Sequence, residues 1–167
     1  LAERIMTNSI TNIVIAGLGG QGVLKASDIL AEAAFRAGLD VKKAEVHGMS
    51  QRGGSVNSDV RFGADLSGAS PMVPGGRADY LVVLTEDQVD NNRRRLSDEG
   101  ELFGPDAVDA SALPHPRSLN VAMLGVLSTR LDIDESHWLE AIHANLPAKV
   151  HEVNDQAFAL GRSSGSR

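Results

Sequence analysis

The stretch that decides the fold is 12–34, which reads NIVIAGLGGQGVLKASDILAEAA. It opens with a short apolar run rich in β-branched residues, 12–16, which is typical of a strand buried on both faces of a parallel sheet. A glycine-rich turn follows, and from 22 to about 37 apolar residues recur at three- and four-residue spacing, which predicts an amphipathic helix. Gly38 ends this helix, and the strand-like run 40–46 comes next. The order of these elements predicts a β-α-β unit.

Strands and helices continue to alternate along the rest of the chain. Apolar runs predict further strands at 80–84, 100–104 and 107–111. Apolar spacing and cap residues predict helices at 85–96 (opened by a capping box at Thr85), 120–131, 134–146 and 154–160. The run 55–62 alternates less cleanly and indicates an antiparallel or edge strand. We therefore expect an α/β protein with three layers, α/β/α and Rossmann-like, in which a mostly parallel sheet carries helices on both faces.

The composition limits both the organisation and the function of the chain. Its 167 residues suit one domain, expected at 12–161, between an N-terminal extension (1–11) and a disordered tail (162–167). With 16 Lys and Arg against 22 Asp and Glu, the net charge of −6 argues against a nucleic-acid binder. The absence of cysteine excludes disulfides, a thiolate nucleophile and cysteine-ligated clusters within this chain. No apolar run suits a membrane span or a signal peptide, so we expect a cytoplasmic protein without a membrane partner.

The glycine turn is the first candidate site. Gly17, Gly19 and Gly22 form a G-x-G-x-x-G pattern between a strand and a helix, and Gly20 adds a further glycine. Such a turn brings backbone N–H groups and a helix N-terminus to a phosphate or carboxylate, although it also serves as a tight turn alone. A dinucleotide site would further need an acidic residue about 20 positions on. Glu45 stands near that spacing but adjoins an unusual loop.

That loop, 47–54, reads HGMSQRGG and is the second candidate site. Its histidine changes charge near neutral pH, and its arginine offers a planar, permanently charged fork for phosphate or carboxylate. The alternative is a surface excursion whose arginine pairs with an acidic neighbour. Among the other four histidines, His137 and His143 lie on different faces of one predicted helix, and His115 and His151 lie in separate segments, so the sequence predicts no metal site.

Four quoted segments carry a resemblance to a known family. They are 12–34, KKAEVHGMSQRGGSVNSDVRFG (42–63), NVAMLGVL (120–127) and AKVHEVNDQAFALG (148–161). In this order they resemble the γ-type subunits of the 2-oxoacid:ferredoxin oxidoreductases, and among these most the β subunits of indolepyruvate ferredoxin oxidoreductases. The most specific pieces are G-x-G-G-Q-G-V and E-V-H-G-M-x-Q-R-G-G.

The resemblance implies a heteromeric enzyme that oxidatively decarboxylates a 2-oxoacid, such as an aryl pyruvate, to an acyl-coenzyme A and passes electrons to ferredoxin. Thiamine diphosphate, its magnesium ion and the iron–sulfur clusters would lie on partner subunits. This chain alone would then bind no cofactor and be inactive, with coenzyme A as a candidate ligand at the interface. We expect a hetero-oligomer with the thiamine diphosphate-binding subunit, and a homodimer is an alternative for the isolated chain.

The resemblance also suggests which residues face the active site. It implies that His47, Gln51 and Arg52 do so, but it gives none of them a chemical step, so no catalytic residue is assigned. The predicted ligand-binding residues come from the turn and the loop: Gly17, Gly19, Gly20, Gln21, Gly22, Ser50, Gly53 and Gly54. Two alternatives stay open at this point, a free-standing dinucleotide-binding oxidoreductase and a non-catalytic nucleotide-binding module.

Overall fold

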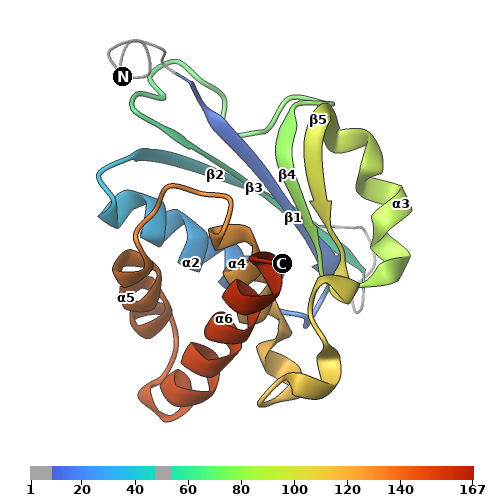
Figure 1. Ribbon diagram of the computed structural model, residues 1–167. Helices are drawn as coiled ribbons and strands as arrows, with labels where there is room; N and C mark the ends of the chain where they lie inside the picture. Colours follow the sequence, from blue (N-terminus) through green and yellow to red (C-terminus); the bar gives the residue numbers. More distant parts are fainter. Residues whose placement is uncertain (1–8, 48–53) are drawn as a thin grey trace.

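A five-stranded sheet forms the centre of the computed structural model, which describes residues 9–47 and 54–167 (Figure 1). The strands lie in the order β2-β3-β1-β4-β5. Their bounds are β1 Thr11–Leu18, β2 Asp40–His47, β3 Ser55–Gly63, β4 Ala78–Val83 and β5 Leu96–Phe103. The helices are α2 Val23–Arg36, α3 Val89–Asn92, α4 Leu119–Ser128, α5 Glu135–Asn145 and α6 His151–Gly165, with short 3-10 turns between some of these elements.

Four of the five strands run in the same direction, which confirms the mostly parallel sheet. β1 pairs in parallel with β4, and β4 with β5. β3 is antiparallel to both β1 and β2, so it alone is reversed. The predicted unit β1-α2-β2 therefore exists, but β3 lies between its two strands. The run 55–62 is antiparallel, as expected, and has an internal place in the sheet.

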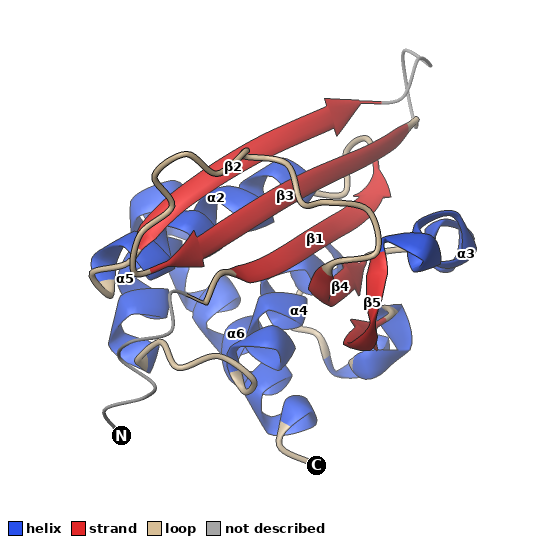
Figure 2. Ribbon diagram, turned by 90° about the horizontal axis from the view of Figure 1, so that it is seen from above, coloured by secondary structure: helices blue, strands red, loops and turns tan. Residues whose placement is uncertain are grey.

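The main core lies on the face of the sheet that the long helices cover. Figures 1 and 2 show α2, α4, α5 and α6 together on this face. Because side chains alternate along a strand, Ile13 and Ile15 point into this core, where both are fully buried. Trp138 of α5 and Phe158 of α6 meet there with ring centroids 5.7 Å apart. These contacts fix the helical layer against β1.

The opposite face of the sheet has a smaller core and a thinner cover. Val14 and Ala16 point to this side and pack with Val89 of α3 and with Val73. Val73 belongs to the connection between β3 and β4, which crosses over the sheet in Figure 2. The predicted α/β class with helices on both faces is confirmed, although one layer holds four helices and the other only the short α3.

Two local predictions were wrong. The segment 85–96 is not one helix, because the four-residue α3 stands between two 3-10 turns and β5 already begins at Leu96. Thr85 makes no side-chain capping hydrogen bond, so the predicted capping box is absent. The segment 107–111 is not a strand: Val108 packs into the main core, and a 3-10 turn follows it.

The end of the chain is helical, whereas we predicted a disordered tail at 162–167. α6 continues to Gly165, and the guanidinium of Arg130 donates from Nη1 to the Gly165 carbonyl oxygen at 2.8 Å. This tertiary contact outweighs the weak helix propensity of serine and glycine. Within 9–47 and 54–167, no helix combines the length and the apolar character that crossing a membrane requires.

Candidate functional site

The glycine turn after β1 is held in shape by Gln21. The Leu18 N–H donates to Gln21 Oε1 at 2.7 Å, and the Gln21 N–H donates to the Leu18 carbonyl oxygen at 3.1 Å. Gly20 and Gly22 have φ angles of 88° and 82°, a region that favours glycine. Gln21, which we predicted to bind a ligand, thus has a structural function in the turn.

The other predicted glycines connect this turn to its surroundings. Gly17 is buried, and a Cβ atom there would lie 2.9 Å from Gln21 Oε1, so its lack of a side chain serves packing. The Gly19 N–H donates to the Gly54 carbonyl oxygen at 2.9 Å, which ties the turn to the start of β3. The structure therefore brings the predicted turn glycines together with Gly54. The predicted residues Ser50, Gln51, Arg52 and Gly53 lie outside the described residues.

The N-terminus of α2 lies at the glycine turn. Gly22 is the N-cap of α2, and the first helical backbone hydrogen bond runs from the Ala26 N–H to the Gly22 carbonyl oxygen at 2.9 Å. The N–H groups of 23–25 consequently have no acceptor within the helix. Together with the positive end of the helix dipole, they form a site suited to an anion.

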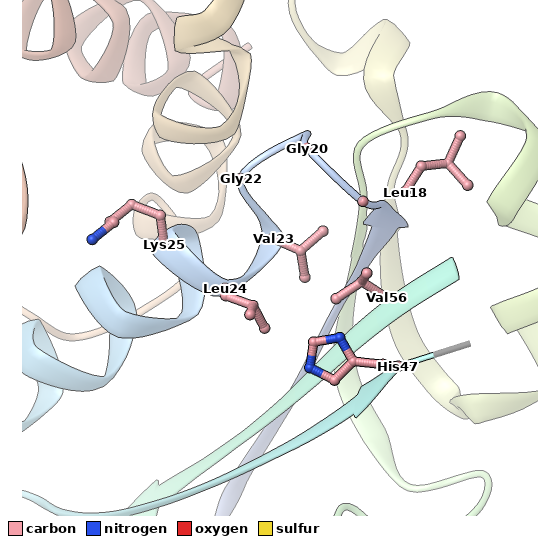
Figure 3. Close-up of a pocket in the computed structure, with 9 residues that line it drawn as sticks. Leu18, Gly20, Gly22, Val23, Leu24, Lys25, His47 and Val56 are labelled. Carbon is pink, nitrogen blue, oxygen red and sulfur yellow. The ribbon is translucent and has the colours of Figure 1, made fainter. Parts of the chain in front are cut away.

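A hollow of about 420 Å³ opens on the β2 side of the turn. In Figure 3 the imidazole of His47, at the end of β2, lies across from Val23 and Leu24 at the start of α2. The aliphatic side chain of Val56 borders the same space. The structure thus places His47, which belongs to the second predicted site, beside the glycine turn, which is the first predicted site. The described parts of the two sites border one hollow.

A second hollow, of about 470 Å³, lies on the α4 side of the same turn. It shares Gly20, Gly22 and Lys25 with the first hollow and adds Arg117 and Asn120. Lys25 and Arg117 are exposed, whereas Asn120 is only 8% exposed and donates from Nδ2 to the Gly22 carbonyl oxygen at 3.2 Å. Two cations and a helix N-terminus therefore border one space.

The charges around the turn differ from those of the whole chain. The net charge is −6, yet neither hollow has an aspartate or glutamate in its described lining. Lys25 and Arg117 form no ion pair with a described carboxylate, unlike Lys43 or Arg95. This local positive charge favours a ligand with phosphate or carboxylate groups.

Our sequence reasoning missed Lys25, Arg117 and Asn120. Lys25 had a signal, since it stands in the first helical turn after the glycines. Arg117 and Asn120 had none, because only the packing of α4 against the turn brings them there.

The structure disfavours the dinucleotide alternative. Glu45, the acidic residue considered for the ribose, is bound to Lys43 with Oε1 and Nζ 3.0 Å apart. β3 separates its strand from β1, whereas a dinucleotide fold places the acidic residue on the strand beside the glycine turn. Among the described residues, no cluster of histidine, aspartate and glutamate could hold a metal ion.

Comparison with known proteins identifies the family of this chain. The family model for pyruvate ferredoxin/flavodoxin oxidoreductase matches residues 12–116. The indolepyruvate oxidoreductase subunit IorB of Thermococcus kodakarensis is 35% identical over 190 residues, covering 90% of this chain and 93% of that protein.

Two solved structures share the fold. The keto/oxoacid ferredoxin oxidoreductase γ subunit of Geobacter sulfurreducens has a TM-score of 0.77 at 20% identity, covering 93% of this chain and 98% of that one. The 2-oxoglutarate:ferredoxin oxidoreductase of Magnetococcus marinus, solved with 2-oxoglutarate, coenzyme A and succinyl-CoA bound, has a TM-score of 0.77 at 21% identity. This chain matches it over 96% of its own length and 32% of the other.

The α/β fold and these relatives together define an oxidoreductase subunit. The chain belongs to the pyruvate ferredoxin/flavodoxin oxidoreductase family. It is a subunit of a 2-oxoacid:ferredoxin oxidoreductase, which confirms the resemblance seen in the sequence. Its relatives are subunits of multi-subunit complexes, so a hetero-oligomer is its functional form.

Proposed function

We propose that this chain completes an oxidoreductase for aryl 2-oxoacids such as indolepyruvate, and that its glycine turn holds the phosphate groups of coenzyme A. Its task would be to cover the active site of a thiamine diphosphate-binding partner, whose product is an acyl-coenzyme A, with ferredoxin accepting the electrons. The indolepyruvate assignment is supported by the 35% identical relative. Thiamine diphosphate, magnesium and the iron–sulfur clusters would belong to the partners.

The observation that carries this proposal is that the described linings of the two hollows beside the turn contain Lys25 and Arg117 but no aspartate or glutamate. Coenzyme A bears a pyrophosphate and a ribose phosphate, and it supplies the thiol that takes up the acyl group. The N–H groups of 23–25 would donate to phosphate oxygens, with Lys25 and Arg117 adding charge from either side. A hydrogen bond to a charged group contributes about 1.5–3 kcal/mol, so these residues could hold an anion although the chain is acidic overall.

The turn is shaped for such a ligand. Gly20 has open space where a Cβ atom would stand, so its exposed backbone allows close approach of a bulky group. The hollows on both sides of the turn give the ligand two directions in which to continue. His47 borders the hollow on the β2 side. In this proposal the segment that follows it would face the active site of the partner.

The test uses the complex reconstituted with its partner subunits. Lys25→Gln and Arg117→Gln should each raise KM for coenzyme A about tenfold or more, because each removes a charge-assisted contact with the ligand. Formation of the first intermediate from the 2-oxoacid, measured without coenzyme A, should not change. Arg94→Gln, on an exposed arginine away from these hollows, is the control. An unchanged KM for coenzyme A in the double variant Lys25→Gln/Arg117→Gln would refute the phosphate site.

The substrate is tested with the same complex. We expect kcat/KM for indolepyruvate to exceed that for pyruvate and for 2-oxoglutarate. A preference for either small 2-oxoacid would refute the aryl pyruvate assignment and leave the coenzyme A proposal standing.

A further inference from the structure

Strand β2 (Asp40–His47) forms one edge of the sheet, as Figure 2 shows. Among the described strands only β3 pairs with it, so every second residue of β2 directs its backbone N–H and C=O groups away from the sheet. All eight residues of β2 pair with β3 without a bulge, and none is a proline. Bulges and prolines are two of the features that keep other strands from adding to a sheet edge, and β2 has neither.

Lysine is a third such feature, but the two lysines of β2 are held within this chain. Lys42 Nζ donates to the Ala69 carbonyl oxygen at 2.8 Å, on the side of the connection between β3 and β4. Lys43 Nζ donates to Asp28 of α2 and to Glu45 Oε1. Both side chains are therefore directed over the faces of the sheet, and the backbone edge of β2 stays accessible to another strand.

The charges of β2 match those of a second copy of the same strand. When two copies pair antiparallel in a register centred on a residue, their helical layers lie on the same side of the joined sheet. The register centred on Ala44 places each Lys43 opposite Glu45 of the other copy. The neighbouring registers, centred on Lys43 or on Glu45, place two lysines or two glutamates opposite each other. Because opposite charges stabilise a facing pair and like charges destabilise it, the register centred on Ala44 is favoured.

An exposed aromatic side chain of α2 supports the same pairing. Leu24, Asp28 and Phe35 lie on one side of α2 by their helical spacing. Asp28 binds Lys43, so this side lies along β2. Leu24 borders the hollow on the β2 side of the glycine turn, whereas Phe35 lies at the other end of α2 and is 71% exposed. In an antiparallel pair of copies, the Phe35 end of one α2 meets the Leu24 end of the other.

We propose that two copies of this chain join through β2, antiparallel and centred on Ala44, so that their sheets form one continuous sheet. Backbone hydrogen bonds along β2 hold the copies together, and the facing pairs of Lys43 and Glu45 select the register. Phe35 of each copy covers apolar surface near Leu24 of the other. The second copy thereby adds an aromatic side chain beside the hollow on the β2 side of the turn.

The first test uses the purified chain, whose sequence contains no cysteine. In the proposed register the Cα atoms of the two Ala44 residues are about 4.5–5.5 Å apart, a distance that a disulfide spans. Ala44→Cys should therefore give a disulfide-linked dimer when oxidised glutathione is added. Val46→Cys is the matched control on the same face of β2, and its position is more exposed, at 45%. The register separates its two thiols by about 13 Å, so it should not link.

Random collision would instead link the more exposed position at least as well. Equal linking of the two variants, or stronger linking of Val46→Cys, would therefore overturn the proposed register.

The second test exchanges the charges and measures dimerisation by sedimentation over a dilution series. Lys43→Glu and Glu45→Lys should each raise the dimer Kd about tenfold or more, because each places like charges opposite each other twice. An equimolar mixture of the two variants should restore dimerisation, since both facing pairs in the mixed dimer are then of opposite charge. The mixture controls for effects on folding, because each chain is the same alone and mixed.

Phe35→Ala should also weaken the dimer. Met72→Ala is its control, because Met72 is 50% exposed but belongs to the connection over the opposite face of the sheet. A wild-type chain that stays monomeric at every concentration, or a mixture of the charge variants that does not dimerise, would overturn the inference.

Discussion

Asn120 and Gly22 stand 98 residues apart in the chain, yet the Asn120 Nδ2 donates to the Gly22 carbonyl oxygen at 3.2 Å. This bond joins the start of α4 to the N-cap of α2. The lack of a side chain at Gly22 is what permits it, because a Cβ atom there would collide with the Asn120 carboxamide. The glycine turn and α4 therefore form one structural unit, and both border the hollow that contains Lys25 and Arg117.

The first prediction separates backbone strain from this contact. Gly20→Ala and Gly22→Ala should each lower the free energy of unfolding by about 1–2 kcal/mol, because both residues have positive φ. Gly22→Ala should cost more and should also raise KM for coenzyme A, since it must displace Asn120. Adding Asn120→Ala should recover part of the extra loss. Urea unfolding and steady-state kinetics measure these effects, and equal losses in the two single variants would contradict the prediction.

The second prediction concerns a buried ion pair on the thinly covered face of the sheet. Asp59 of β3 is fully buried, and both its carboxylate oxygens accept from Arg95, at 2.9 and 2.7 Å. Removing one partner of a buried pair leaves an uncompensated charge, which typically costs about 3–5 kcal/mol. The free energy of unfolding of Arg95→Met, measured in urea, should be lower than that of the wild type by about that amount. Its neighbour Arg94 is exposed, so Arg94→Met should stay within about 0.5 kcal/mol.

This ion pair also shows what the sequence could not reveal. The pattern of 55–62 looked irregular because Asp59 and Arg61 occupy positions that face the smaller core. Arg61 is only 8% exposed, and its guanidinium donates to Asn12 Oδ1 and to the carbonyl oxygen of Ser70. No local rule assigns such partners, because Asn12 comes from another strand and Ser70 from the connection that folds back over the sheet after β3. Strand β1, the glycine turn and α2 were predictable because their signals are local.

The same distinction applies to the candidate site. His47 and the turn glycines could be selected from one motif each, and the structure brings them together. Arg117 and Asn120 precede or begin an apolar helix, where nothing nearby indicates a ligand. Only the packing of α4 beside α2 places them at the turn. Sequence reasoning therefore found the residues at the ends of β1 and β2, and it missed Lys25 of α2 together with Arg117 and Asn120 at the start of α4.

A third prediction follows from the close approach of α4 and α6. A Cβ atom at Gly161 would collide with the Ala122 carbonyl oxygen, and one at Gly125 with the Phe158 carbonyl oxygen. Backbone atoms cannot move aside as flexible side chains do. Gly161→Ala should therefore lower the free energy of unfolding by about 1–3 kcal/mol or more. Gly75→Ala is the control, since it has open space at its Cβ position. Thermal unfolding compares them, and equal melting temperatures would show that the helices separate without cost.

The fourth prediction is a pH dependence at Lys43. Burial lowers its pKa, but hydrogen bonds to Asp28 and Glu45 outweigh burial and raise the pKa above its ordinary value. A raised pKa stabilises the fold below the unfolded-state pKa of about 10.4, and this stabilisation is lost as pH rises through the folded-state pKa. The melting temperature of Lys43→Met should therefore be lower than that of the wild type at pH 8. The difference should shrink above about pH 10.4. Lys149→Met, on an exposed lysine, should show no such trend.

The last prediction concerns Arg52, which lies outside the described residues and is argued from the family motif at 45–54. β2 ends at His47 and β3 begins at Ser55, and both of these residues lie at the same end of the sheet as the glycine turn after β1. If Arg52 meets an anionic group of the active site, Arg52→Ala should cost about 1.5–3 kcal/mol, or one to two powers of ten in turnover or assembly. If Arg52 acts only in the complex, the melting temperature of Arg52→Ala should match that of Arg94→Ala, because surface substitutions usually change stability by about 0.5 kcal/mol at most. Early melting with activity lost only in proportion to unfolded protein would show a structural function, and equal activity in the two variants would show that Arg52 contributes nothing.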